Sequence, residues 1–146
     1  IKEIERYEVE FPDDKITVLF WKAFVERRLG NVQYAIELYS AGIILESEMC
    51  SACRMSRAEE YISVGDFASA IDDINVCLND RRQIAVERFH PSLKYQKALL
   101  LALTGDDGFV RASAEVPADY SEYRLGARRD RDALTALYRK HRSIKT

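Results

Sequence analysis

Three cysteines and one histidine are the residues whose types and spacing could support metal or redox chemistry. Cys50 and Cys53 form the sequence Cys-Ser-Ala-Cys, and Cys77 and His90 could in principle complete a four-ligand set. A redox pair needs a thioredoxin-type strand-to-helix junction, and a structural zinc site needs its further ligands at defined spacing. Neither context is present in the sequence. We therefore expect free thiols on helices and no bound metal or cofactor.

Acidic pairs and glycine-rich turns are the other places where catalysis or phosphate binding could occur. Glu59-Glu60 and Asp72-Asp73 are adjacent in sequence, which on a helix points the two side chains about 100° apart. We interpret both pairs as solvated helix faces. The segment 104–108, Thr-Gly-Asp-Asp-Gly, places two acids where phosphate oxygens would have to lie. The sequence therefore predicts no enzymatic activity.

Basic residues gather near the end of the chain. Between residues 119 and 146 eight Lys or Arg stand against four Asp or Glu, a local charge of +4. A basic patch on the last predicted helix could bind RNA, an acidic tail or an acidic protein, and a solvated capping helix explains it equally well. The patch residues are Arg131, Arg139, Lys140 and Arg142.

An internal repeat indicates the elements that position these residues. The heptapeptide from Gly30 to Ile36 is echoed from Gly65 to Ile71, an offset of 35 residues (65 minus 30). A glycine after a helix can adopt the left-handed conformation that ends it, and the Asn or Asp that follows can cap the next helix. Ala35 and Ala70 would then allow two antiparallel helices to approach closely. The pattern predicts repeated helix-turn-helix units.

The second unit resembles the tetratricopeptide repeat. The positions that carry the resemblance are Ala58, Tyr61, Gly65, Asp66, Phe67, Ala70 and Cys77. The first unit matches through Gly30, Asn31, Ala35 and Tyr39, while Trp21 and Phe24 in its leading helix are similar to half-a-tetratricopeptide repeats. A third, degenerate unit has a leading helix from Pro91 to Thr104 closed by Gly105, with about five extra residues expected within 79–90.

The resemblance implies an all-α fold of antiparallel helix-turn-helix repeats, stacked as a short α-solenoid with a C-terminal capping helix and no β-sheet. We expect a single helical-repeat segment of a longer protein. Its predicted parts are the end of a preceding unit (1–12), repeat 1 (13–49), repeat 2 (50–84), a degenerate repeat 3 (85–116) and a C-terminal region (117–146) with a helix from about Asp130 to Arg142.

The family uses its leading helices to line a partner-binding groove, which implies a mostly apolar surface here. The groove residues implied by the resemblance are Ala52, Met55, Glu59, Ile62, Ser63, Ser92, Tyr95, Leu99 and Ala102. Such a groove would bind an amphipathic helix or an extended segment of another protein within a larger assembly. The alternative is that the same residues pack against the protein's own later helices. Met55, Glu59 and Tyr95 replace the donors of the family's carboxylate clamp.

Composition limits the remaining function classes. The chain has 146 residues, a formal charge of −2 and 47% hydrophobic residues, which describes a folded chain rather than a disordered one. A dedicated nucleic-acid binder would normally be basic overall, so nucleic acid is the less favoured partner. No apolar run approaches the ~20 residues that a membrane-spanning helix needs. The odd number of cysteines favours a reducing compartment, the cytoplasm or the nucleus.

Overall fold

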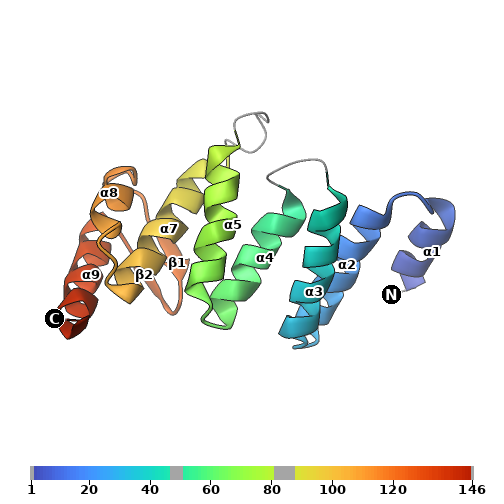
Figure 1. The fold of residues 1–146 in the computed structure, drawn as a ribbon, viewed down its shortest axis with the longest axis horizontal. Coiled ribbons are helices and arrows are strands. Elements are labelled where there is room, and N and C mark those ends of the chain that lie inside the picture. The colour runs from blue at the N-terminus through green and yellow to red at the C-terminus, as the bar shows by residue number, and fades with distance from the viewer. Residues whose placement is uncertain (1, 47–50, 81–87, 146) are drawn as a thin grey trace. The chain divides into compact units, whose positions relative to one another are not determined.

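The computed structural model describes residues 2–46, 51–80 and 88–145, and these form an all-α fold, as the sequence predicted (Figure 1). The chain divides into two compact units, Ile1–Asp80 and Arg81–Thr146. Unit 1 contains α1 (Lys2–Glu10), α2 (Lys15–Arg28), α3 (Val32–Leu45), α4 (Ala52–Ser63) and α5 (Phe67–Asn79). Unit 2 contains α7 (His90–Thr104), α8 (Phe109–Ala114), β1 (Glu122–Arg124), β2 (Ala127–Arg129) and α9 (Arg131–Lys145).

Unit 1 is built from two helical hairpins that stack side by side. α2 packs on α3, α4 packs on α5, and α3 joins the two hairpins by packing on α4, while α1 lies against α2. Ala35 and Ala70 are both 0% exposed, as expected for small residues at close helix contacts. Tyr39 and Cys53 complete the core between the hairpins.

Three glycine turns end helices with the same geometry. Gly30, Gly65 and Gly105 have φ values of +85°, +79° and +63°. At each turn the glycine N–H donates to the carbonyl three residues back, and the next N–H donates to the carbonyl five residues back. This pair of hydrogen bonds is the Schellman motif, which requires the left-handed conformation that glycine tolerates best. The predicted turns are therefore confirmed, in both units.

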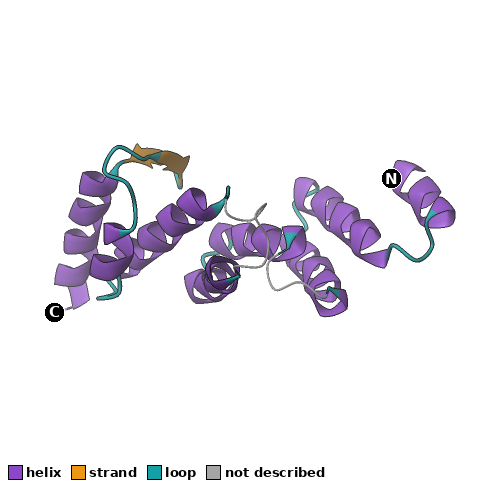
Figure 2. Cartoon of the chain, turned by 90° about the horizontal axis from the view of Figure 1, so that it is seen from above, coloured by secondary structure: helices purple, strands orange, loops and turns teal. Residues whose placement is uncertain are grey.

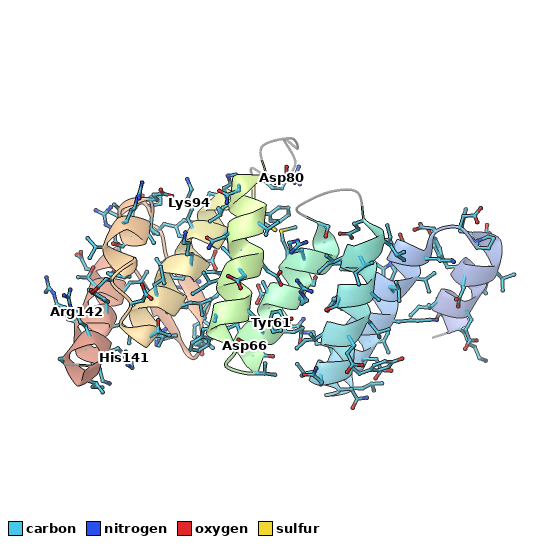
Figure 3. All side chains as sticks on the ribbon, in the orientation of Figure 1. Tyr61, Asp66, Asp80, Lys94, His141 and Arg142 are labelled. Carbon is cyan, nitrogen blue, oxygen red and sulfur yellow. The ribbon has the colours of Figure 1, made fainter. Side chains whose placement is uncertain are left out.

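The predicted helix caps are confirmed only in part. The carboxylate of Asp66 accepts a hydrogen bond from the Ser69 N–H at 3.2 Å, as predicted. Asp14, which follows no glycine turn, caps α2 by accepting a hydrogen bond from the Thr17 N–H at 3.2 Å. Asn31 makes no side-chain cap; its amide donates instead to the Glu26 carboxylate at 2.7 Å. Asp66 and Tyr61, which lies in the last turn of α4, are together at one end of the α4–α5 hairpin (Figure 3).

Unit 2 contains a β-hairpin, so the expectation of no β-sheet is wrong. β1 and β2 pair antiparallel, with Tyr123 opposite Arg128, and lie beside the helices of unit 2 (Figure 2). The two-residue turn consists of Leu125 and Gly126, whose φ values are both positive at +50° and +83°. A two-residue turn of this kind matches the twist of the strands and therefore closes a tight hairpin.

The predicted final helix is confirmed, and it packs onto the preceding helices of its unit. The Asp130 carboxylate accepts the Ala133 N–H at 2.9 Å at the start of α9. Leu134 and Tyr138 are buried, and the Tyr138 ring stacks on Phe109 of α8 at 4.7 Å. A Cβ added to Gly105 would lie 2.8 Å from the His141 backbone, so the end of α7 packs directly on α9.

Two further expectations concern the connections and the membrane. The segment 79–90, in which about five extra residues are expected, falls mostly outside the described residues. None of the helices in the described part of the chain is both long enough and apolar enough to cross a bilayer.

Candidate partner-binding surface

An aromatic cleft between α1 and α2 is an apolar hollow of unit 1 that leaves large side chains partly exposed. It has a volume of about 420 Å³ and is lined by Glu3, Ile4, Tyr7, Trp21, Phe24 and Val25. Trp21 keeps 47% of its surface exposed although it lies on the packed helix α2. Its indole meets the Phe24 ring edge to face, with centroids 5.6 Å apart and planes at 81°. Two nearly perpendicular aromatic rings thus line the cleft.

Asp14 fixes the two helices that form this cleft. Its carboxylate caps α2 and also accepts a hydrogen bond from the Tyr7 hydroxyl of α1 at 2.6 Å. The hydrogen bond to Asp14 raises the pKa of the Tyr7 phenol, and the same bond lowers the pKa of the Asp14 carboxyl. Tyr7 also packs on Phe11, with ring centroids 4.7 Å apart. Asp14, the N-cap of α2, therefore holds Tyr7 of α1 against α2.

The α2 aromatic residues divide between the core and the cleft. Phe20 faces inward and contacts Tyr39 of α3 at 5.9 Å between centroids, whereas Trp21 and Phe24 face α1. The Arg28 guanidinium covers one side of Phe24 at 5.7 Å from its centroid. Sequence reasoning recognised Trp21 and Phe24 only as family positions. The sequence feature that could have indicated the cleft is that Ile4 and Tyr7 lie on one face of the first helix, while Trp21 and Phe24 lie on one face of the second.

The α4 residues of the predicted groove remain partly at the surface. Ala52 and Ser63 are exposed, Met55 and Glu59 are half-buried, and Ile62 is buried at 8% exposure. Four of the five positions on α4 are thus accessible, while the Ile62 side chain belongs to the core of unit 1.

A polar network beneath α4 corrects the interpretation of the acidic pairs. Asp73 is 2% exposed and accepts hydrogen bonds from Arg57 through both carboxylate oxygens, at 2.8 and 2.6 Å. Arg54 donates to the same carboxylate at 3.2 Å, and Arg57 also donates to the Ser40 hydroxyl at 3.0 Å. One buried acid therefore links α3, α4 and α5. Only Asp72 of this pair is solvated as predicted.

The interpretation of the second acidic pair, Glu59-Glu60, is also wrong in part, because Glu60 is buried. Its side chain is 2% exposed and forms an ion pair with Arg27 of α2, with 2.6 Å between Arg27 Nε and Glu60 Oε1. Burial raises the pKa of the Glu60 carboxyl, and the Arg27 charge opposes that shift. Adjacent acids on a helix face different directions, so the two acids of a pair need not both be solvated. In each pair the second acid, Glu60 or Asp73, faces inward.

The α7 residues of the predicted groove are largely buried in the protein's own fold. Tyr95, Leu99 and Ala102 are at most 1% exposed, and only Ser92 is half-buried. The Tyr95 hydroxyl donates to the backbone carbonyl of Arg129 at 2.7 Å and lies 3.2 Å from that of Glu122. The hairpin thus occupies the surface that Tyr95 was expected to offer to a partner. Covered side chains cannot contact another protein, so Tyr95, Leu99 and Ala102 are not surface residues of a groove.

The hairpin is held by further contacts around Tyr95. Tyr120 packs on the Tyr95 ring at 5.7 Å between centroids, and its hydroxyl donates a hydrogen bond to the Glu122 carboxylate. Burial, together with that carboxylate, raises the pKa of Tyr120 to about 12. Arg124 donates to the other Glu122 oxygen at 2.8 Å. Burial raises the pKa of Glu122, but hydrogen bonds with Ser92, Tyr120 and Arg124 outweigh burial and lower it.

The four residues of the basic patch lie on α9 in different environments. Arg139 and Lys140 are exposed. Arg131 is half-buried and donates to the Val116 carbonyl at 3.1 Å. Arg142 donates to the Tyr138 hydroxyl at 2.8 Å and lies 3.5 Å from the Asp107 carboxylate; Figure 3 marks it near the end of α9. Half of the predicted patch therefore has a structural role within unit 2.

The cysteines differ from the expectation of three free thiols. Cys53 is free and buried, and its burial, together with the Glu46 carboxylate, raises the pKa of the thiol to about 12. Cys77 is disulfide-bonded, so that part of the prediction is wrong. Cys50 lies outside the described residues. Among residues 2–46, 51–80 and 88–145, no group of three or more His, Cys, Asp or Glu could hold a metal ion.

Comparisons with known proteins leave the family resemblance as an expectation. Protein-family models, curated proteins and solved structures were each compared with the chain, and none of them matches it. The turns at Gly30, Gly65 and Gly105 are observed in the structure. Membership of the tetratricopeptide family is not shown by any of these comparisons.

Proposed function

We propose that this chain is a non-catalytic protein-interaction scaffold whose docking site is the aromatic cleft between α1 and α2. The observation that carries the proposal is the 47% exposure of Trp21 in a cleft walled by Tyr7 and Phe24. Tryptophan and tyrosine in desolvatable pockets supply much of the binding energy at protein interfaces. The partly exposed stripe of Met55 and Glu59 on α4 offers a second contact surface within unit 1.

The partner in this proposal is a segment of another protein in a multi-protein complex. A cleft of about 420 Å³ accommodates one or two side chains rather than a whole helix face. We propose the cytoplasm or the nucleus as the compartment. The support for this compartment is the odd number of cysteines; the disulfide of Cys77 removes the expectation of three free thiols.

An alternative function is supported by the exposed Arg139 and Lys140 of α9. In that case the chain would bind RNA or an acidic tail through its basic end. Salt distinguishes the two functions, because phosphate binding weakens steeply with salt whereas docking of apolar side chains does not.

Photocrosslinking tests the proposed function. Val25 lines the cleft, so Val25→p-benzoylphenylalanine would place a crosslinker inside it, and the same replacement at Tyr34, an exposed aromatic residue of α3, serves as the control. We expect a protein crosslinked from position 25 and absent from position 34. A partner captured only by a crosslinker at Lys140 would favour the alternative, and no protein captured from position 25 would contradict the proposal.

A further inference from the structure

The β-hairpin of unit 2 belongs to a closed loop whose two ends are fixed in the helical core. This loop, residues 117–130, is named the strap. Val116 directly before the strap is 1% exposed, and Leu134 in the first turn of α9 is 0% exposed. The Arg131 guanidinium donates to the Val116 carbonyl at 3.1 Å and so joins the two ends. Surface loops of about 6–16 residues with adjacent ends form compact units of their own.

The strap contributes no buried side chain to unit 2. Every residue from 117 to 130 is half-buried or exposed, and the hairpin lies beside the helices of the unit (Figure 2). The large buried apolar side chains come from α7, α8 and α9 and include Leu93, Leu99, Leu100, Phe109, Leu134 and Tyr138. Because burial of apolar surface is the dominant stabilising contribution to folding, the helical core keeps its main source of stability without the strap.

Polar contacts hold the strap on α7. The Tyr95 hydroxyl donates to the Arg129 carbonyl at 2.7 Å and lies 3.2 Å from the Glu122 carbonyl. The Glu122 carboxylate also hydrogen-bonds with Ser92 in the first turn of α7, and the Tyr120 ring packs on Tyr95. A broken hydrogen bond is replaced by one to water, so each contributes little net free energy. Detaching the strap therefore costs less than unfolding the helices.

The hairpin itself depends on this attachment. Its strands have three residues each, and an isolated two-stranded hairpin is marginally stable in water. Leu125 in the turn has a φ of +50°, a conformation that is unfavourable for leucine. A strap detached from α7 would therefore lose the hydrogen bonds between its strands, which makes the opening visible to hydrogen exchange.

We propose that the strap opens and closes as one unit between Val116 and Leu134 while α7, α8 and α9 stay folded. In the closed state Tyr95 is 0% exposed. In the open state its hydroxyl and the side of its ring that Tyr120 covers become accessible. The strap thus controls access to the centre of α7, and the Ser92–Glu122 contact helps to keep it closed. This device lies in unit 2 and is independent of the proposed docking cleft in unit 1.

Native-state hydrogen exchange of the 146-residue chain in low urea tests the opening. After correction for intrinsic rates, we expect amides within 122–129 to exchange at least about tenfold faster than those within 93–102. Exchange of the strap should depend only weakly on urea, because its opening exposes little surface. Exchange of the α7 amides should follow the urea dependence of full unfolding, which urea denaturation measures separately.

A matched pair of serine variants tests the contact that closes the strap. Ser92→Ala removes the hydroxyl that bonds with Glu122 and should speed exchange within 122–129 by about twofold to tenfold, with exchange within 93–102 unchanged. Ser143→Ala removes a hydroxyl that donates to the Lys140 carbonyl near the end of α9, and it should leave the strap unchanged. Circular dichroism checks that both variants are folded.

Three outcomes would overturn the inference. Equal exchange rates with equal urea dependence in 122–129 and 93–102 would show that the strap unfolds only together with the helices. Exchange within 122–129 at the intrinsic rate would show that the closed strap is not populated. Faster exchange of α7 and the strap by the same factor in Ser92→Ala would show that Ser92 stabilises the helix rather than the closed strap.

Discussion

The Tyr95 hydroxyl donates to the Arg129 carbonyl at 2.7 Å and so ties the centre of α7 to the last residue of the hairpin. Tyr95 is 0% exposed, and the carbonyl of Glu122, directly opposite Arg129 in the ladder, lies 3.2 Å from the same hydroxyl. The buried Tyr95 hydroxyl thus contacts a backbone carbonyl in each of the two strands. A two-stranded hairpin alone is marginally stable in water, so the packing on α7 accounts for its persistence.

Tyr95→Phe should loosen the hairpin without disturbing the helices. The change removes one hydroxyl from a buried site and should lower the free energy of unfolding by about 0.5–1.5 kcal/mol, the usual net value of a hydrogen bond. Urea denaturation measures the loss, and hydrogen exchange should show faster exchange at residues 122–129. Tyr123→Phe is the matched control, because Tyr123 is 68% exposed. An equal loss in both variants would contradict the anchoring role of Tyr95.

Leu125→Asn should stabilise unit 2. Leu125 has a φ of +50°, a conformation that costs most non-glycine residues about 1–2 kcal/mol and that asparagine tolerates better. Asn-Gly is also the preferred pair for this type of two-residue turn. We expect a gain of up to about 1 kcal/mol in thermal or urea unfolding. Leu125→Val should instead destabilise the turn, and a gain with valine would show that strain at this position is not the cause.

Ala70→Leu should overpack the contact inside the α4–α5 hairpin. Ala70 is 0% exposed, whereas Ala68, two residues earlier, is exposed. The larger side chain at position 70 should cost about 1–3 kcal/mol, and Ala68→Leu should change stability by less than about 0.5 kcal/mol. Thermal melts followed by circular dichroism measure both. Identical melts for the parent and both variants would mean that the helix register is wrong.

Asp73→Ala should be among the more damaging single changes in unit 1. It would leave the half-buried Arg54 and Arg57, whose side chains are 19% and 18% exposed, without the carboxylate between them. Breaking a buried ion pair costs about 3–5 kcal/mol. Asp72→Ala removes an exposed acid from the same helix and should cost less than about 0.5 kcal/mol. Comparable urea midpoints for the two variants would disprove a structural role for the network.

Sequence reasoning predicted the helical hairpins because their signals are local. A glycine that needs a positive φ, a following Asp66 that caps, and Ala70 at a close contact are each readable within a few residues. The β-hairpin of unit 2 was not predicted, because its signals are not local. Its strands have three residues each, too few for an alternating pattern, and Leu125-Gly126 is not a usual turn pair. Its stability depends on Tyr95, which is 27 residues from Glu122 in sequence.

The candidate site was less predictable than the fold. The predicted groove residues Tyr95, Leu99 and Ala102 are buried, which agrees with the alternative that they pack within the protein itself, and family positions alone did not decide between the two. The burial of Asp73 had a local signal, since it lies one helical turn after the buried Ala70 and therefore on the same face. The identity of its partners, Arg54 and Arg57, depended on how α4 packs on α5.

Arg27→Ala should cost stability in a pH-dependent way, because Arg27 is the ion-pair partner of the buried Glu60. The folded-state pKa of Glu60 is raised above the ordinary value of 4.5, so the contribution of Glu60 to stability is fully present below 4.5 and is lost as pH rises through the folded pKa. Removing Arg27 raises that folded pKa further. The variant should therefore lose about 1–3 kcal/mol at neutral pH and little below the ordinary glutamate pKa.

A double-mutant cycle isolates this effect. In a Glu60→Gln background position 60 carries no carboxylate, so Arg27→Ala should cost less than about 0.5 kcal/mol and its cost should not change with pH. Urea unfolding of the four proteins, from the neutral range down to the onset of acid unfolding, measures the coupling between Arg27 and Glu60. A pH-independent loss on removing Arg27 would mean that the aliphatic stem of Arg27, rather than its charge, stabilises the contact between α2 and α4.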